Sequence, residues 1–201
     1  MNFVRTITKA ALAAIITGAA VAGTLGFNDL LAPAHQASAA SSRQPAPTAS
    51  DTEHAVETLN SFYKPALKGQ FPGRAAKFTI GQTARADILR SFGSPDVPRS
   101  SATGFDAYGA NMGNPGYAFA YKSNTLSEMR YFGTHVERQT NIGGITMKIL
   151  KQQWYAPSST TTITTGKVKQ TKLTYIRGDY KLEFIFNNST DLDHINLTRK
   201  G

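Results

Sequence analysis

Two carboxylates and an imidazole stand together near the end of the chain, in Asp191-Leu192-Asp193-His194. Such a set could bind a cation or transfer a proton. A calcium loop would also need a glycine at its sixth position and a distal glutamate, and this segment has neither. The surrounding letters, NNSTDLDHINL, fit a hairpin loop over 187–191 followed by a half-exposed strand. We therefore interpret the segment as a turn and a strand.

The histidines of the chain lie too far apart in the sequence to indicate a metal site. Beyond residue 39 the chain holds only His54, His135 and His194, and the nearby carboxylates are Glu53 and Glu57, beside His54. Zinc sites usually pair their ligands more closely. The chain has no cysteine, which excludes disulfides, thiolate metal sites and a cysteine nucleophile. Serine nucleophile elbows, phosphate loops and dinucleotide fingerprints are also absent, so we predict no metal, no cofactor and no catalytic residue.

The tripeptide Arg177-Gly178-Asp179 matches the integrin-recognition motif. It stands between two alternating apolar runs, where a tight hairpin loop is expected. Two-residue hairpins favour Gly-Asp for backbone reasons alone. We therefore interpret this tripeptide as a turn.

The first 39 residues have the order of a secretory signal peptide. Arg5 and Lys9 precede an apolar stretch over 10–27, and the small residues ASA follow at 37–39. Because alanine, glycine and threonine dilute the stretch, we expect cleavage rather than a membrane anchor, and no membrane span in the mature chain. The sequence thus predicts a secreted protein.

The predicted mature chain stays basic. Cleavage removes two basic residues and one acidic residue from a formal charge of +9, which leaves +8. The Ser/Pro/Ala-rich residues 40–50 cannot repay the entropy of ordering and are expected to form a flexible lead-in. With 201 residues and 40% apolar content, the chain has room for one domain with a real core, which we place at 51–201.

Two helices are expected in the first part of this domain. One runs from Asp51 as its cap to about Leu67, with an apolar stripe made of Val56, Leu59, Tyr63 and Leu67, and it should kink or end early at Pro65. The second begins after Thr83 as its cap and ends at the Gly93 stop signal, with Ile88, Leu89 and Phe92 on one side.

Strands follow these helices. Tyr117, Phe119 and Tyr121 alternate with small or polar residues, which is typical of a strand with one buried face. A turn at 123–124 leads to a second run through Leu126, Met129 and Tyr131. The glycine-rich stretch 104–116 before them is expected to form turns.

The same order of elements recurs downstream. At an offset of 62 residues, Ile80-Gly81 matches Ile142-Gly143, Ile88 matches Leu150, Phe92 matches Trp154 and Pro95 matches Pro157. With shifted offsets, the strand residues 117–121 match 180–184, and Leu126 and Met129 match Leu192 and Ile195. We predict an α+β fold with two tandem repeats of a helix followed by an antiparallel sheet, at about 78–133 and 140–198.

Three stretches resemble known families. FTIGQTARADILRSFGSPD (78–96) resembles the helix motif of bacterial outer-membrane assembly lipoproteins and beta-lactamase inhibitory proteins. YAFAYKSNTLSEMRYFG (117–133) and YKLEFIFNNSTDLDHINL (180–197) are similar to YjgB-like secreted proteins of Bacillus-type bacteria, a family whose domain is of unknown function. The resemblance implies two sheets joined edge to edge, helices on one face, and the other face open to a partner.

Strand alternation predicts which side chains point away from the helices. The predicted binding residues on that face are Lys122, Glu128, Arg130, Lys181, Glu183 and His194. Such a mixed, polar face suits docking better than catalysis, so the leading hypothesis is a secreted, non-catalytic binding module. Its partner would be an extracellular protein or a cell-wall polyanion. Nucleic acid is not expected, because the aromatic side chains alternate into the core.

The alternative hypothesis is a small cell-envelope hydrolase with an acidic/His site. It would use Glu128, Glu183, Asp193 or His194. This hypothesis predicts carboxylates that converge in a concave pocket.

Overall fold

The computed structural model describes residues 48–111, 113–134, 142–165 and 167–201. Its first helix begins with a capping box. The Asp51 backbone N–H donates to Thr48 Oγ1, and the Thr48 N–H donates to the Asp51 carboxylate. Helix α1 (Ala49–Ser61) thus begins two residues before Asp51, the residue expected to cap it. The predicted signal peptide, residues 40–47 and His135 lie outside the described residues.

The first predicted helix is broken near its end, as its proline indicated. Phe62 separates α1 from α2 (Tyr63–Ala66), which contains Pro65. The predicted apolar stripe is wrong at its C-terminal end, because Tyr63 is 44% exposed and Leu67 47% exposed. The chain has turned at Phe62, so the spacing of one continuous helix no longer applies.

The next two helices start differently. Thr83 does not cap α3 (Arg85–Phe92) as predicted, because its Oγ1 accepts the Thr79 backbone N–H, and Ala84 takes the cap position without a side-chain bond. In contrast, Thr146 caps α4 (Met147–Trp154) by accepting the Ile149 N–H at 3.1 Å. Gly93 ends α3 with φ +83°, as the stop signal predicted. Two 3-10 turns, η1 (Gly73–Ala75) and η2 (Ile142–Gly144), complete the helical elements.

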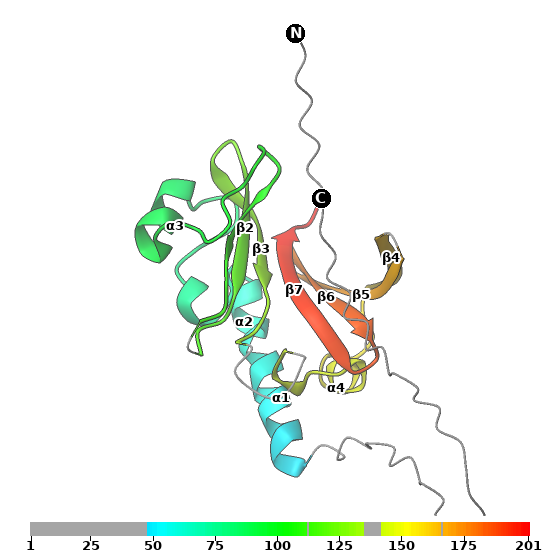
Figure 1. Cartoon of the computed structure of the whole chain (residues 1–201). Coiled ribbons are helices and arrows are strands. Elements are labelled where there is room, and N and C mark those ends of the chain that lie inside the picture. The colour runs from blue at the N-terminus through cyan, green and yellow to red at the C-terminus, as the bar shows by residue number, and fades with distance from the viewer. Residues whose placement is uncertain (1–47, 112, 135–141, 166) are drawn as a thin grey trace, which may run out of the picture. The chain divides into compact units, whose positions relative to one another are not determined.

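Seven antiparallel strands form one sheet in the order β1-β2-β3-β7-β6-β5-β4. The strands are β1 (Phe105–Tyr108), β2 (Tyr117–Lys122), β3 (Thr125–Tyr131), β4 (Ser159–Thr165), β5 (Val168–Arg177), β6 (Tyr180–Asn188) and β7 (Asp191–Arg199). The β1–β3 half joins the β7–β4 half where β3 pairs with β7 (Figure 1). The predicted α+β class is confirmed, whereas the duplication stays a prediction. β1, within the supposed turn region, and β4 were not expected.

Each half has a β-bulge in its central hairpin. Opposite β2, the pairing skips Ser127, so Leu126 and Met129 are both buried although they are three residues apart. Opposite β6, the pairing skips Asp193, so Leu192 and Ile195 are both buried. An inserted residue is what lets two apolar side chains at this spacing face the same side of a sheet.

The helices cover one face of the sheet, where the core lies. In the first half Phe92 of α3 packs on Phe119 with ring centroids 5.4 Å apart, and in the second half Trp154 of α4 packs on Phe184 at 5.5 Å. Phe62, between α1 and α2, contacts Tyr131 of β3 at 5.0 Å. Each large side chain buried here stabilises the fold by roughly 1.5–3 kcal/mol.

One carboxylate lies on the core side of the sheet. Asp106 of β1 is 0% exposed, and the Arg85 guanidinium of α3 donates to both of its oxygens at 2.7 and 3.2 Å. The Arg99 backbone N–H donates a third bond at 3.0 Å. Burial alone would raise the pKa of Asp106, but these donors outweigh it and lower the pKa. The pair therefore ties α3 to the outer strand.

Candidate binding face of the sheet

The strand register places all six predicted binding residues on the face opposite the helices, here called the polar face. One row of paired residues crosses it from Arg130 through Asn196 and Glu183 to Thr174. A neighbouring row runs from Glu128 through Thr198 to Lys181. Lys122 lies near the end of β2, opposite Thr125, and His194 lies opposite Ile185. The register shows a shared surface and leaves the binding role a prediction.

The carboxylates of the polar face are held in ion pairs. Glu183, only 9% exposed, accepts from Lys172 Nζ at 3.0 Å and lies 3.8 Å from Lys181 Nζ. Glu128 accepts from Arg130 Nε at 2.8 Å. Each of these two glutamates is therefore engaged by at least one cation of the polar face.

Two buried oxygen atoms at the centre of the face have no partner within the described structure. They are Asn196 Oδ1 and Thr198 Oγ1, on β7 between β3 and β6. Asn196 is 7% exposed. Leaving a buried polar atom unpaired costs about 1–3 kcal/mol, and both oxygens are shielded from solvent by the side chains around them.

His194 does not contribute a positive charge to this face near neutral pH. Burial lowers the pKa of its imidazole, and the neighbouring Asp193 only partly opposes that effect. Its Nδ1 lies 2.5 Å from Asp193 Oδ2, and its ring packs near Phe132. Asp193 occupies the β7 bulge, so the bulge is what brings the two groups together. The cations of the face are therefore Lys122, Arg130, Lys172 and Lys181.

The candidate catalytic groups do not converge as the hydrolase hypothesis requires. Glu128 of β3 lies opposite Thr198 of β7, whereas Glu183 of β6 lies opposite Asn196 of β7. The two carboxylates form separate ion pairs, with Arg130 and Lys172 respectively. Asp193 bonds to its neighbour His194 instead. Over the described ranges, no three His, Asp or Glu side chains are grouped as metal ligands would be.

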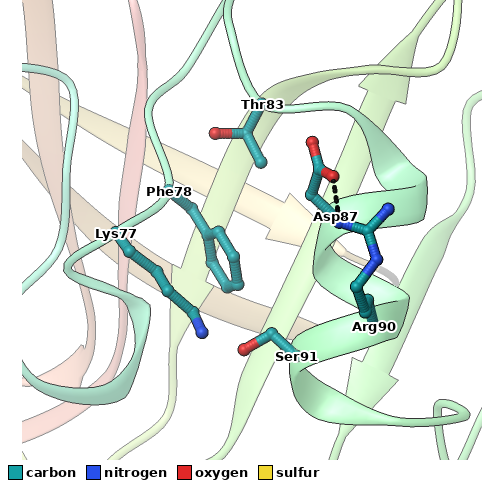
Figure 2. A pocket seen from close by; sticks show the side chains of 6 residues that line it. All are labelled: Lys77, Phe78, Thr83, Asp87, Arg90 and Ser91. Atoms are coloured by element: carbon teal, nitrogen blue, oxygen red, sulfur yellow. Dashed lines mark hydrogen bonds and ion pairs between the residues drawn. The ribbon is translucent and has the colours of Figure 1, made fainter.

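A hollow that no sequence motif indicated lies beside α3. Its lining residues are Lys77, Phe78, Thr83, Asp87, Arg90 and Ser91. Figure 2 shows the Phe78 ring between the Lys77 side chain and α3. Asp87 and Arg90 are paired at 2.9 Å and stay largely exposed. Among the lining residues of the hollow, Lys77 is therefore the cation that is not paired with Asp87, and it lies beside the buried ring of Phe78. Only the side-by-side packing of α3 and the 77–83 segment creates the hollow, so no motif could have revealed it.

A second hollow lies between α1 and the ends of β2 and β3. His54 and Glu57 line it together with the rings of Phe62, Tyr117 and Tyr131. Burial raises the pKa of both tyrosines. The helical spacing of His54 and Glu57 was visible in the sequence, but the aromatic wall opposite them comes from distant strands.

With this geometry in view, the comparisons with known proteins identify the family. A family model described as a domain of unknown function, DUF4309, matches residues 59–198. The chain belongs to the DUF4309 family. This confirms the resemblance inferred from the strand motifs.

The relatives give the fold experimental support. The chain is 36% identical to the uncharacterized protein YjgB of Bacillus subtilis (strain 168), over 96% of its own length and 100% of the relative's. The crystal structure of YjgB, a DUF4309 family protein, matches with a TM-score of 0.67 and 37% identity over 74% of this chain and 99% of that one. A weaker likeness, with a TM-score of 0.43 and 12% identity over 60% of this chain and 44% of the other, is to an extracellular protein of Bacillus anthracis (strain Ames) that contains a SCP domain.

None of the helices within the described residues is long and apolar enough to cross a bilayer.

Proposed function

We propose that the chain is an exported, non-catalytic binding module whose polar face binds an acidic segment of an extracellular protein. The single observation that carries the proposal is the pair of unpaired acceptors at the centre of that face, Asn196 Oδ1 and Thr198 Oγ1. Each stands between the ion pairs of Glu183 and Arg130 in the strand register. A partner that displaces the side chains covering them and donates to them would satisfy groups that the chain alone leaves unsatisfied.

The charges of the face favour an acidic partner. Four cations, Lys122, Arg130, Lys172 and Lys181, share the face with two carboxylates, Glu128 and Glu183. Charge complementarity raises association rates and fixes the orientation of a complex. The expected export signal and the basic mature chain point the same way.

A protein suits this face better than a simple polyanion. Three of the four cations are already engaged by Glu128 and Glu183, whereas a polyanion would be bound best by unpaired cations. A mixture of ion pairs and free hydrogen-bond acceptors matches the composition of protein interfaces.

Capture by charge-reversal variants tests the proposal. The predicted mature chain and its Arg130→Glu and Lys181→Glu variants are immobilised and exposed to the culture-medium and wall fractions of the source bacterium. Lys151→Glu is the matched control, because Lys151 is exposed on α4, away from the polar face. A protein retained by the parent and the control but lost by both face variants supports the proposal.

Two outcomes would overturn it. Equal capture by all four proteins would show that the polar face is not the binding surface. Binding confined to a wall polymer, with a steep loss as salt rises, would replace the protein partner by a polyanion.

A further inference from the structure

Arg177 lies at the end of β5, on the helix side of the sheet, within a set of aromatic rings. Its guanidinium carbon is 4.5 Å from the ring centroids of Tyr63 and Trp154 and 5.4 Å from that of Tyr175. We call these four residues the aromatic–arginine cluster. The two-residue turn that follows has φ +60° at Gly178, which suits a type II′ hairpin. The tripeptide is thus a turn, with its arginine packed against rings.

The guanidinium of Arg177 has hydrogen-bonding capacity to spare. Its Nη1 donates to the carbonyl of Ile176 at 2.8 Å, and its Nε is buried with no partner in the described structure. Among the described residues no carboxylate forms an ion pair with it, whereas Arg85, Arg90 and Arg130 each have one. Burial lowers the pKa of Arg177, yet an arginine side chain stays charged in proteins.

The cluster is both held in place and accessible. Trp154 Nε1 donates to Asn60 Oδ1 at 3.0 Å, and the Tyr175 hydroxyl donates to the carbonyl of Tyr155 at 3.1 Å. These bonds fix two of the three rings. Tyr63, which meets Trp154 edge to face at 5.4 Å, is 44% exposed. A ligand would therefore meet a preformed surface, which reduces the entropy lost on binding.

We propose that the aromatic–arginine cluster binds a small ligand that joins a carboxylate to a ring with an apolar face, either a sugar or an aromatic ring. Arg177 is half-buried, so the carboxylate accepts from the part of its guanidinium that reaches solvent, while the buried Nε stays out of reach. The ring packs on the exposed part of Tyr63. A carboxylate is preferred to a phosphate monoester because one cation balances one negative charge, whereas the monoester carries nearly two. This site lies on the helix side and does not depend on the proposed function of the polar face.

Fluorescence titration tests the proposal, because Trp154 is the only tryptophan of the chain. The probes form two matched pairs, N-acetylmuramic acid with N-acetylglucosamine and benzoate with benzyl alcohol. We expect a saturable change with at least one acid at millimolar concentration, and a response at least about tenfold weaker with its neutral counterpart. The pair that responds identifies the ring as a sugar or an aromatic one.

Variants locate the binding. Arg177→Met keeps an apolar stem without the charge and should weaken binding at least about tenfold. Arg74→Met is the matched control, since the Arg74 guanidinium also stacks on a ring, at 4.1 Å from Phe92, outside the cluster. Should Arg177→Met fail to fold, Tyr63→Ala at the exposed ring gives the same reading. The proposal is overturned if neither acid binds better than its neutral counterpart, or if the cluster variants bind as well as the control.

Discussion

The two halves of the sheet carry the same arrangement of helix, ring and guanidinium. In the first half α3 ends at Phe92, with Arg74 stacked on the ring at 4.1 Å. In the second half α4 ends at Trp154, with Arg177 stacked on it at 4.5 Å. These two aromatic residues are also the ones that correspond at an offset of 62 in the sequence.

The surroundings of the two rings differ. Phe92 packs among Tyr108, Tyr117 and Phe119, which close that half into core. Trp154 instead meets the half-exposed Tyr63, supplied by α2. None of the ring contacts of Phe92 within the described residues comes from α2. Similar scaffolds thus acquire different surfaces, depending on which other segments of the chain pack beside them.

The largest expected effect is the loss of the central ring of the second half. Trp154→Ala should lower the free energy of unfolding by about 3–5 kcal/mol, because it removes a buried ring and its bond to Asn60. Phe92→Ala, at a more exposed ring, should cost less. Urea unfolding followed by circular dichroism measures both. Equal losses would show that the two halves depend on their rings to the same extent.

Asp106 belongs only to the first half, so its removal tests a difference between the halves. Asp106→Asn leaves the Arg85 guanidinium without its counter-charge and should cost about 3 kcal/mol at pH 7. Asp87→Asn, which breaks the exposed pair with Arg90, should cost no more than about 0.5 kcal/mol.

The same aspartate predicts how stability varies with pH. Folding lowers the pKa of Asp106. Its contribution to the free energy of unfolding is therefore fully present above the unfolded pKa of about 3.9 and is lost as the pH falls through the folded pKa. The Asn variant should therefore lose less stability between pH 5 and pH 2 than the parent. Parallel acid titrations with the same slope in the two proteins would contradict this assignment.

On the polar face, a polar-to-apolar change should stabilise the fold. Asn196→Leu removes the unpaired Oδ1 and should raise the free energy of unfolding by about 1 kcal/mol, while partner capture is lost. Thr161→Val on the exposed outer strand β4 is the control and should change little. If Asn196→Leu destabilises the chain by a similar amount, the amide has a structural partner after all.

The smallest effects concern the two helix caps. Thr146→Ala should cost α4 about 1 kcal/mol, because the Ile149 N–H loses its acceptor. Ala84→Ser should stabilise α3 by up to about 1 kcal/mol, since Ala84 is exposed and its ψ of 150° already suits a cap. Thermal melts of the pair measure the contrast between the helices. A Thr146→Ala variant that melts at a higher temperature than the parent would contradict the assignment of Thr146 as the cap of α4.

Sequence reasoning predicted the strands that alternate and missed those that do not. The alternating runs at 117–122 and 180–188 predicted β2 and β6, because a strand with one buried face has an apolar side chain at every second residue. β1 escaped notice because glycines surround it, and it carries a buried charge, Asp106, on its core side. β4 is an exposed edge strand with little apolar signal. Thr83 failed as a cap because the local turn over 79–83 uses its hydroxyl to accept the Thr79 backbone N–H.

By itself the sequence determined the α+β class, the family and the residues that face each side of the sheet. The class and the two faces follow from local periodicity, which side-chain burial imposes on strands and helices, whereas the family was inferred from the resemblance of the strand motifs. The tertiary structure alone decided that Asn196 and Thr198 lie unpaired between two ion pairs, and that Arg177 meets rings from α2, α4 and β5. Such groupings depend on strand order and helix packing between distant segments, which leave no local pattern.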